Sequence, residues 1–433
     1  MDSGKAAREK IYARVLKDIK PSKLEIEGTI ANANRVMAKL KSIVPKNVKL
    51  VIAGSIARST NLKGDHDIDI FMLFDKKVPK KTLERQGIAY AKKVMGAKEG
   101  KFEIKYAQHP YARLHLKEID MRVDVVPAYK IDSIEELATA VDRTPLHTRF
   151  INDHLSDRQR DDVRLLKYLL KTHNIYGAEA MTQGFSGYLC ELMVHSFGSL
   201  DNLLENAVRF RSPLALNPKN MAEKIDKSIF KKFNSEFVVI DPVDKDRNVA
   251  AGVSQESLAR FMLVAKEFLD KPDAKVFLGA GFSHSDVRKR VDAMLKASGL
   301  HLYLIETKIP DKSEDIIWPQ LRKASDIIAA EAKKRGFDIY MRHVWVDSNM
   351  GYIAYLAPHE ANMVRLYCGP SAFHGLKNTE AFLDAHKNAV AIMFDGERIN
   401  ALDHSDYHTL EHLLLAVTKG RLIERRKDIL LKG

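Results

Sequence analysis

Two carboxylates stand at the head of an apolar run that is typical of a β-strand. Asp67 and Asp69 are two residues apart, and residues 70–74 that follow them are all apolar. Side chains two apart in a strand point to the same face, so we expect both carboxylates to project side by side. The wet face of an amphipathic strand is the simpler interpretation, but such a strand would continue to alternate. A strand buried on both faces carries neighbouring carboxylates only where cations neutralise them, and we therefore predict a cation site.

A later apolar stretch carries a third candidate carboxylate. Asp124 lies between Val123 and Val125, whereas Asp120, at the start of the same strand beside Glu118, is expected to be solvated. Three convergent carboxylates can hold two Mg²⁺ ions about 3.5–4 Å apart and so promote phosphoryl transfer. Oxygen ligands suit this hard cation better than they suit zinc. The predicted catalytic and metal-binding residues are therefore Asp67, Asp69 and Asp124.

A Gly-Ser pair precedes the first carboxylate by eleven residues. Gly54 lets the backbone approach a phosphate group, and Ser55 is expected to open a helix over 56–62 whose free N–H groups favour anions. Arg58 on that helix can reach the same phosphates. By itself the pair is equally an ordinary helix cap, and only the carboxylates make it indicative of nucleotide chemistry.

The order of the expected elements predicts an α+β multidomain protein. A chain of 433 residues that is 45% apolar can form two to four cores. Interleaved strands and helices predict a mixed-sheet domain over 1–150, and a mainly helical pattern predicts a second domain over 151–270. Residues 271–433 have the β-α-β-β-α-β order of a ferredoxin-like sheet, which many RNA-binding domains and many other proteins share.

Each predicted element has a residue range. Two helices separated by Pro21 are expected within 1–45. Further helices are predicted at 82–96, 156–173, 186–209, 254–270, 284–298, 317–335, 379–388 and 406–418. Strands are predicted at 48–53, 68–74, 102–107, 112–117, 121–126, 300–307, 338–346, 351–357 and 390–394.

Charge and cysteine usage restrict the partners and the compartment. The net charge of +13 favours a polyanionic partner without indicating a chemistry. Cys190 and Cys368 form no CxxC pair, which argues against a disulfide framework and a thiolate zinc site and favours a reducing compartment. The first 20 residues lack the features of a signal peptide, and no apolar run is long enough to cross a bilayer, so we expect a cytoplasmic location and no membrane. The oligomeric state is left open, a homodimer included.

Together the Gly-Ser pair and the three carboxylates resemble the signature of the nucleotidyltransferase superfamily, which includes poly(A) polymerases, oligoadenylate synthetases and CCA-adding enzymes. Further blocks are similar to the archaeal-type, class I CCA-adding enzymes, which are tRNA nucleotidyltransferases. These blocks are GSIARSTNLKG at 54–64, HPY at 109–111, VDVVPAYK at 123–130, AVDRTPLH at 140–147, VRLLKYLLK at 163–171, NIYGAE at 174–179, GFSGYLCELM at 184–193 and DPVDKDRNVAAGVS at 241–254. The similarity is dense over about 50–255 and thin beyond 270.

The resemblance implies a function and a role for each domain. It implies a nucleotidyltransferase head over 1–150, a neck over 151–270 that recognises the base, and a body with an RNA-binding tail over 271–433. The implied reaction adds C, C and A to the 3′ end of tRNA from CTP and ATP without a template, uses two Mg²⁺ ions and releases pyrophosphate. The tRNA would be bound through its acceptor stem and 3′ end. The alternatives are a poly(A)-type or oligoadenylate nucleotidyltransferase and a catalytically inactive RNA-binding protein.

The resemblance also implies roles for single residues. Ser55, Arg58, Thr144, His147, Lys167, Tyr176 and Arg247 would bind the nucleotide, and His109 and Pro110 would contact RNA. Thr144 and His147 would contact the triphosphate and ribose, Lys167 the triphosphate, and Arg247 the base edge. Local alternatives remain open, because Thr144 before a proline is also an ordinary N-cap, Lys167 could snorkel to a domain edge, and Tyr176 could anchor a turn. Gln108 and Ile56 depart from the family's usual residues.

Overall fold

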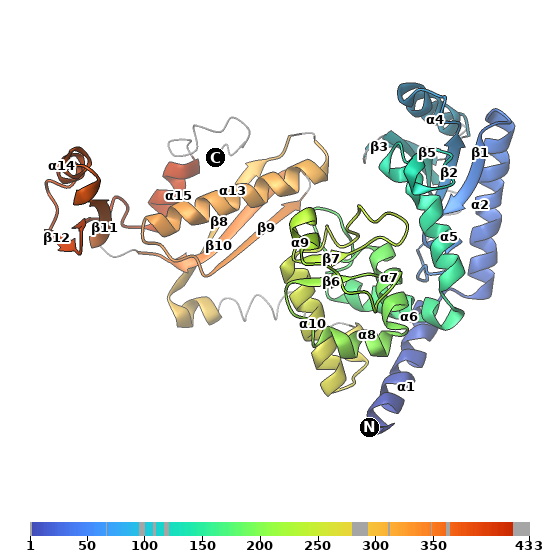
Figure 1. Cartoon of the computed structure of the whole chain (residues 1–433), viewed down its shortest axis with the longest axis horizontal. Coiled ribbons are helices and arrows are strands. Elements are labelled where there is room, and N and C mark those ends of the chain that lie inside the picture. The colour runs from blue at the N-terminus through green and yellow to red at the C-terminus, as the bar shows by residue number, and fades with distance from the viewer. Residues whose placement is uncertain are drawn as a thin grey trace. The chain divides into compact units, whose positions relative to one another are not determined.

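The computed structural model describes residues 2–65, 67–94, 100–106, 110–116, 121–278, 293–310, 312–347, 349–360 and 364–418. The chain divides into two compact units, Met1–Gly281 and Phe282–Gly433 (Figure 1). The first unit contains both the mixed sheet and the helical layer that the sequence predicts. Among the described residues, no helix combines the length and the apolar character needed to cross a membrane.

Two helices begin the first unit, as predicted. Helix α1 (Asp2–Ile19) and helix α2 (Lys23–Ile43) are separated at Pro21. Ser22 accepts a hydrogen bond from the Glu25 backbone N–H while the Glu25 side chain accepts one from Ser22, a reciprocal cap that fixes where α2 begins.

A five-stranded mixed sheet follows, with the order β1-β2-β5-β4-β3. Its strands are β1 (Lys49–Ala53), β2 (Asp67–Phe74), β3 (Gly100–Tyr106), β4 (Pro110–Leu116) and β5 (Met121–Tyr129). Strands β2 and β5 run parallel at its centre, and the other neighbouring pairs are antiparallel. The predicted mixed sheet is therefore confirmed.

The two faces of this sheet differ. Ile68, Ile70 and Met72 project from β2 into a core that also takes residues of α2 and of α4 (Lys80–Val94). The opposite face of the same strand carries Asp69 and then Phe71, which belongs to a much smaller apolar cluster. The strand is thus buried on both sides beyond its carboxylates, as its sequence predicts.

A mainly helical layer completes the first unit. Its helices are α5 (Thr144–His154), α6 (Asp157–Thr172), α7 (Gly187–Phe197), α8 (Leu200–Ala207), α9 (Ser228–Phe233), α10 (Gln255–Asp270) and α11 (Lys275–Leu278), with two 3-10 turns, η2 (Ile134–Glu136) and η3 (Ala140–Arg143), before them. Two short parallel strands, β6 (Leu214–Leu216) and β7 (Phe237–Val239), lie between α8 and α10. Tyr12, Val15 and Ile19 of α1 belong to the core of this layer.

The predicted continuous helix over 186–209 is wrong, because two helices occupy that range. Helix α7 ends at Gly198, which has a left-handed φ of 79°, and Ser199 then caps α8 by accepting a hydrogen bond from the Asn202 N–H. Glycine adopts such a φ without steric cost, and serine is a favoured N-cap, so the Gly-Ser pair breaks the helix locally.

The second unit contains two three-stranded antiparallel sheets. The first has the order β8-β10-β9, from β8 (Leu300–Lys308), β9 (Met341–Asp347) and β10 (Met350–Pro358). Helices α13 (Glu314–Lys334) and α15 (Leu410–Thr418) share its core with Ile353 and Tyr355. The second sheet has the order β11-β13-β12, from β11 (Val364–Ser371), β12 (Ala391–Asp395) and β13 (Arg398–His404), accompanied by η4 (Ala372–His374) and α14 (Leu376–Ala385).

The C-terminal part is α/β as predicted, but its strands do not join one ferredoxin-like sheet. The strand predicted at 390–394 pairs with β13 instead of the first sheet. Strands β11 and β13, which the sequence reading did not resolve, provide the hydrogen-bonding partners that draw it into a second sheet. Most of the helix predicted at 284–298 and the basic tail at 421–432 lie outside the described residues.

Candidate functional site

The parallel pairing of β2 and β5 brings two of the predicted carboxylates together. Asp69 lies directly opposite Asp124, and Asp67 lies opposite Arg122. Burial, and then the neighbouring charge of Asp124, raises the pKa of Asp69 to about 6. The predicted convergence of Asp124 with the Asp67/Asp69 strand is therefore present in the backbone register.

The carboxylate oxygens of two of these residues face guanidinium groups. Arg113 binds both oxygens of Asp124 at 2.7 Å, and Arg122 binds those of Asp67 at 2.6 and 2.9 Å. In the part of the chain that the structure describes, no three acidic, histidine or cysteine side chains are gathered closely enough for a metal ion. The two arginines thus neutralise charge where the sequence predicts cations.

The chemistry of the donors fits a divalent metal ion. Asp69 is a partly buried carboxylate beside a second one, and its pKa is raised first by burial and then by the charge of Asp124, both of which a bound cation would offset. All the predicted ligands are oxygen atoms, which Mg²⁺ prefers. Asp67, Asp69 and Asp124 would hold the metal once Arg122 releases Asp67 and Arg113 releases Asp124.

The Gly-Ser turn lies against Asp69. Ala53, the last residue of β1, pairs with Asp69 in the sheet, so the chain turns directly beside this carboxylate. Gly54 has a φ of 73°, and a Cβ atom on it would lie 1.9 Å from the Asp69 Oδ2 atom. Only glycine satisfies both conditions, which explains the Gly-Ser signature in this position.

The helix predicted over 56–62 is wrong in length. Helix α3 (Gly54–Ala57) is a single turn, and Ser59 then adopts a left-handed φ of 54°. The chain leaves the helix because side chains of the helical layer bind the carbonyl groups that a continuing helix would use internally.

Arg58 points into a buried polar cluster that joins the sheet domain to the helical layer. Its Nε atom lies 2.8 Å from Glu191 Oε2, and the two side chains are 9% and 0% exposed. Thr60 donates a 2.5 Å hydrogen bond to the same carboxylate. Burial raises the pKa of Glu191, but Arg58, Lys167 and Thr60 outweigh burial and hold the pKa below its usual range.

Lys167 belongs to this cluster and is only 2% exposed. Its ammonium donates to the Thr60 carbonyl at 3.0 Å and to the Thr60 hydroxyl at 3.1 Å, and lies 3.7 Å from Glu191. A Cβ atom on Gly187 would lie 3.1 Å from the Tyr176 hydroxyl and 3.5 Å from the Lys167 Nζ atom, so both groups border the same space. The structure therefore gathers Arg58, Lys167 and Tyr176.

Sequence reasoning missed Glu191. The available signal was a carboxylate inside the apolar block at 184–193, the same kind of signal that marked Asp69 and Asp124.

A second cluster centres on Asp241. Its carboxylate accepts a 2.8 Å hydrogen bond from Arg247 Nη1 and lies 2.8 Å from His147 Nε2 and 3.2 Å from the Tyr188 hydroxyl. The His147 ring stacks on Tyr188 with centroids 4.0 Å apart. Burial lowers the pKa of His147, whereas contacts with His147 and Arg247 keep the pKa of Asp241 low despite its burial. Sequence reasoning identified His147 and Arg247 but missed Asp241 and Tyr188.

The remaining predicted residues are less informative. Arg143, not Thr144, holds the N-cap position of α5, so the ordinary-cap interpretation of Thr144 is wrong. The backbone carbonyl of Thr144 accepts a hydrogen bond from Thr148. Pro110 is the first residue of β4, and His109 lies outside the described residues.

Three family models match the chain in sequence order. A nucleotidyltransferase domain matches residues 34–151, a tRNA nucleotidyltransferase second domain matches 161–278, and a CCA-adding enzyme C-terminal domain matches 298–422. The CCA-adding enzyme of Methanocaldococcus jannaschii is 38% identical over 96% of this chain and 91% of its own length. The chain belongs to the CCA-adding enzyme family. The family's enzyme from Sulfurisphaera tokodaii is 34% identical over 93% of this chain and 90% of its own length.

As a CCA-adding enzyme family member, the chain is a nucleotidyltransferase, and solved structures agree with this fold. One structure of the Cid1 poly(U) polymerase aligns over 64% of this chain and 98% of its own, with a TM-score of 0.51 and 17% identity. A cytoplasmic RNA terminal U-transferase aligns over 64% of this chain and 100% of its own, with a TM-score of 0.50 and 16% identity. These likenesses concern the fold alone. The family relationship does not favour the poly(A)-type or inactive alternatives.

Proposed function

We propose that this protein adds C, C and A to the 3′ end of tRNA from CTP and ATP, without a template and with release of pyrophosphate. The observation that carries the proposal is the position of Asp69, which lies beside Asp124 on one side and against Gly54 on the other. The proposed metal ligands and the proposed phosphate-binding turn are thereby neighbours, as nucleotidyl transfer requires.

Asp67, Asp69 and Asp124 are the proposed ligands of two Mg²⁺ ions. When bound, these ions would lower the pKa of the attacking RNA hydroxyl and offset charge on the triphosphate. Arg113 and Arg122 neutralise two of the ligands in the structure described here and would have to release them for the metal to bind.

The proposed triphosphate site is the buried cluster around Arg58. Arg58 and the ammonium form of Lys167 face a single carboxylate, that of Glu191, and burial lowers the pKa of Lys167 because its positive charge is not fully offset there. An uncompensated buried charge is costly, and a phosphate oxygen beside it would offset that cost. Ser55, Thr144 and Tyr176 are the proposed polar neighbours of the same phosphates.

The proposed base and ribose contacts lie around Asp241. Arg247 is anchored through one nitrogen and is 34% exposed, so its other donors remain free to meet the edge of a base. His147, held by the same carboxylate, is the proposed ribose contact. The guanidinium of Arg247, held by Asp241, would thus help to select the incoming base without any nucleic acid template.

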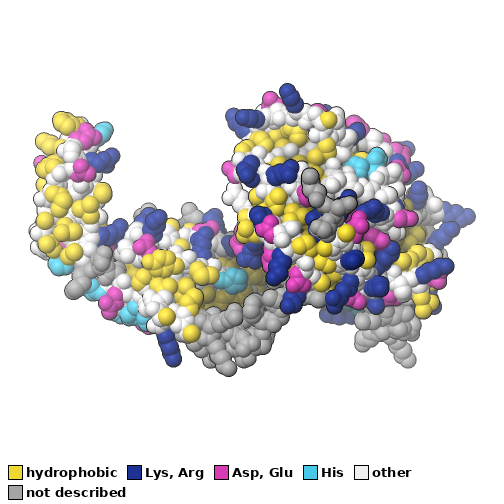
Figure 2. All heavy atoms as spheres, turned by 90° about the horizontal axis from the view of Figure 1, so that it is seen from below, with side chains coloured by type: hydrophobic (Ala, Val, Ile, Leu, Met, Phe, Trp, Pro, Cys, Tyr) yellow, Lys and Arg dark blue, Asp and Glu magenta, His cyan; other side chains and the backbone are white. Residues whose placement is uncertain are grey.

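We propose that tRNA is bound through its acceptor stem and 3′ end, with His109, Pro110 and the second unit as contacts. On the face seen in Figure 2, Lys and Arg side chains are interspersed with Asp and Glu rather than gathered in one stripe. With a net charge of +13, the affinity for tRNA should nevertheless fall as salt rises.

The direct test uses a tRNA that lacks its last three nucleotides, incubated with CTP, ATP and Mg²⁺. We expect extension by three nucleotides followed by a stop, and a ladder of adenylates would overturn the proposal. Asp69→Ala should abolish extension and leave the tRNA dissociation constant within about threefold, because Asp69 is proposed to bind metal and not RNA.

A further inference from the structure

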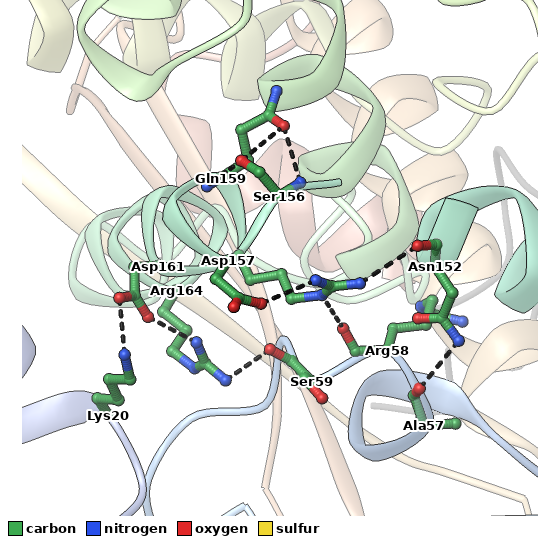
Figure 3. A network of polar contacts seen from close by, with 11 residues as sticks. Lys20, Ala57, Arg58, Ser59, Asn152, Ser156, Asp157, Gln159, Asp161 and Arg164 are labelled. Carbon is green, nitrogen blue, oxygen red and sulfur yellow. Dashed lines mark hydrogen bonds and ion pairs between the residues drawn. The ribbon is translucent and has the colours of Figure 1, made fainter. Parts of the chain in front are cut away.

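Five consecutive carbonyl groups after the Gly-Ser turn accept hydrogen bonds from side chains of the helical layer. Figure 3 shows the region of the first three, at Ala57, Arg58 and Ser59. The acceptors are residues 57–61, here called the carbonyl segment. The donors are Asn152 to Ala57 at 3.2 Å, Arg160 to Arg58 at 3.1 Å, Arg164 to Ser59 at 2.5 Å and to Asn61 at 2.9 Å, and Lys167 to Thr60 at 3.0 Å.

The spacing of the donors on α6 explains how one helix can follow the segment. Arg160, Arg164 and Lys167 are four and three residues apart, which places them along one face of the helix. Arg160 binds the first of the carbonyls that this helix contacts, that of residue 58, and Arg164 binds the carbonyls of residues 59 and 61, on either side of the one that Lys167 binds.

Acidic residues one turn earlier hold both arginines in place. Asp157 binds Arg160 at 3.0 Å, and Asp161 binds Arg164 at 2.7 Å and also Lys20 of α1 at 2.7 Å. The Arg164 side chain is only 4% exposed, so its orientation is fixed by packing as well as by charge.

The carbonyl segment requires such support. Ser59 has a φ of 54°, a left-handed conformation that is strained for a residue with a Cβ atom. Backbone strain of this kind persists where the surroundings fix it, and Arg164 fixes it by binding the carbonyls on either side of Thr60. The segment carries Arg58 and directly follows the turn at Ser55.

We infer that Arg160 and Arg164 are positioning residues for the triphosphate of the incoming nucleotide, although neither binds it. They act through the backbone of the carbonyl segment, which orients Arg58 and the Gly-Ser turn. This inference rests on the proposed function. Because both CTP and ATP present the same triphosphate, loss of the support weakens both nucleotides equally, whereas base recognition at Arg247 and the binding of tRNA stay unchanged.

The test compares Arg164→Ala, Arg164→Lys and Arg160→Ala with the matched control Arg158→Ala. Arg158 is on the same helix, is 77% exposed and pairs with Glu9 instead of the carbonyl segment. We expect Arg164→Ala to raise the KM for CTP and for ATP about tenfold, as loss of a charged hydrogen bond implies. The kcat should stay within about threefold, and the KM for tRNA and all constants of Arg158→Ala should equal those of the parent protein. Arg164→Lys should recover part of the loss, because one ammonium can replace one of the two carbonyl contacts.

A merely structural role would give a different result. Unfolding of part of the sample lowers the apparent kcat but leaves KM unchanged, since KM reports on the folded molecules. If Arg164→Ala does not fold, Arg164→Lys and Arg160→Ala carry the test, the latter at a side chain that is 16% exposed. Unchanged KM values in the folded variants, or a rise for only one of the two nucleotides, would overturn the inference.

A binding measurement separates this inference from the proposed function. The dissociation constant of ATP, measured without tRNA, should rise about tenfold in Arg164→Ala and not in Arg158→Ala. Suppose that the parent protein binds ATP, that Arg164→Ala lowers the affinity for ATP, and that no CCA is added to tRNA. The proposed function would then fail while the positioning role stood. Equal ATP affinity in all variants would overturn the positioning role whatever the product on tRNA.

Discussion

Gly54 approaches Asp69 so closely that a Cβ atom on it would lie 1.9 Å from a carboxylate oxygen. The same glycine has a φ of 73°, a backbone conformation that residues with a Cβ atom rarely adopt. The turn that is proposed to receive phosphates and the carboxylate that is proposed to hold metal are therefore fixed relative to each other by the absence of a single side chain.

Gly54→Ala should abolish nucleotide addition, because Asp69 must move away from the turn to admit the methyl group. Gly64→Ala is the matched control: its φ is 78°, but nothing lies within 4 Å of its added Cβ atom. Both variants should lose about 1 kcal/mol of stability from the left-handed backbone. Incorporation assays with thermal unfolding would check this, and equal activity in the two variants would contradict the close contact.

Arg113 occupies both carboxylate oxygens of Asp124 at 2.7 Å and would therefore compete with a metal ion for this proposed ligand. Arg113→Gln removes this competitor, and we expect the Mg²⁺ concentration for half-maximal activity to fall by about three- to tenfold, as loss of a charged contact implies. A Mg²⁺ titration of nucleotide incorporation measures the effect. A raised requirement for Mg²⁺ would show instead that Arg113 helps to hold the ligand in its binding position.

Asp124→Asn provides the complementary measurement. It keeps the shape of the side chain but removes the charge that a metal ion needs, so incorporation should fall by at least a hundredfold at any Mg²⁺ concentration, as with loss of other transition-state interactions. Asp75→Asn, which alters an exposed carboxylate just beyond β2, should behave as the parent protein.

Glu191 makes stability depend on pH in a predictable direction. Its pKa is below the ordinary value of 4.5 in the folded protein, because Arg58, Lys167 and Thr60 outweigh the effect of burial. The stabilisation is therefore complete above about pH 4.5 and is lost as the pH falls through that value toward the folded pKa. Glu191→Gln should lower the free energy of unfolding by about 3 kcal/mol at neutral pH, since it leaves Arg58 and Lys167 without their counterion.

The difference in the free energy of unfolding between Glu191→Gln and the parent protein should become smaller below pH 4.5, because the parent protein also loses the charge of Glu191 there. Denaturant unfolding at several pH values measures it. Glu256→Gln is the control, because that side chain is 72% exposed and pairs with Arg260 on its own helix. A gap that stays constant with pH would mean that Glu191 is not ionised in the folded protein.

Asp241→Asn should impair discrimination between nucleotides rather than the chemical step. The substitution weakens the 2.8 Å contacts that hold Arg247 and His147, so the KM for CTP and ATP should rise about tenfold and incorporation of GTP or UTP should become detectable. Asp246→Asn, at a neighbouring carboxylate that is 68% exposed, should change neither. Strict selection of C and A by Asp241→Asn would contradict a role for this anchor.

The sequence predicts those parts of the site where a charged residue interrupts an apolar run. Asp69 and Asp124 stand inside apolar runs, and two strands with that pattern pair in the middle of the sheet. The two helices around Pro21 were predictable for a related reason, since proline and an N-cap serine are local signals. The burial of Lys167 also follows from its place in the apolar stripe of its helix.

Other features depend on contacts between distant segments. Nothing near Ser55 says that α3 ends at Ala57, because the donors that end it come from α5 and α6, about a hundred residues later. Glu191 and Asp241 each bind residues that the sequence marks as separate candidates, such as Arg58 and Arg247. These pairings cannot be assigned before the fold is known. In the second unit, strand pairing distributes the strands over two sheets, which their order along the chain does not specify.

The carbonyl segment has a consequence for how such enzymes can be recombined. The family's first domain matches residues 34–151, yet the four donors of the carbonyl segment all lie beyond that range, and two of them, Arg164 and Lys167, lie in the stretch matched by the second domain. A gene fragment that ends at residue 151 would encode the sheet and all three carboxylates while leaving all five carbonyls without their donors. Chimeras between relatives should therefore work when residues 54–61 and α6 come from one parent, and should fail to bind nucleotide when the junction separates mismatched versions of them.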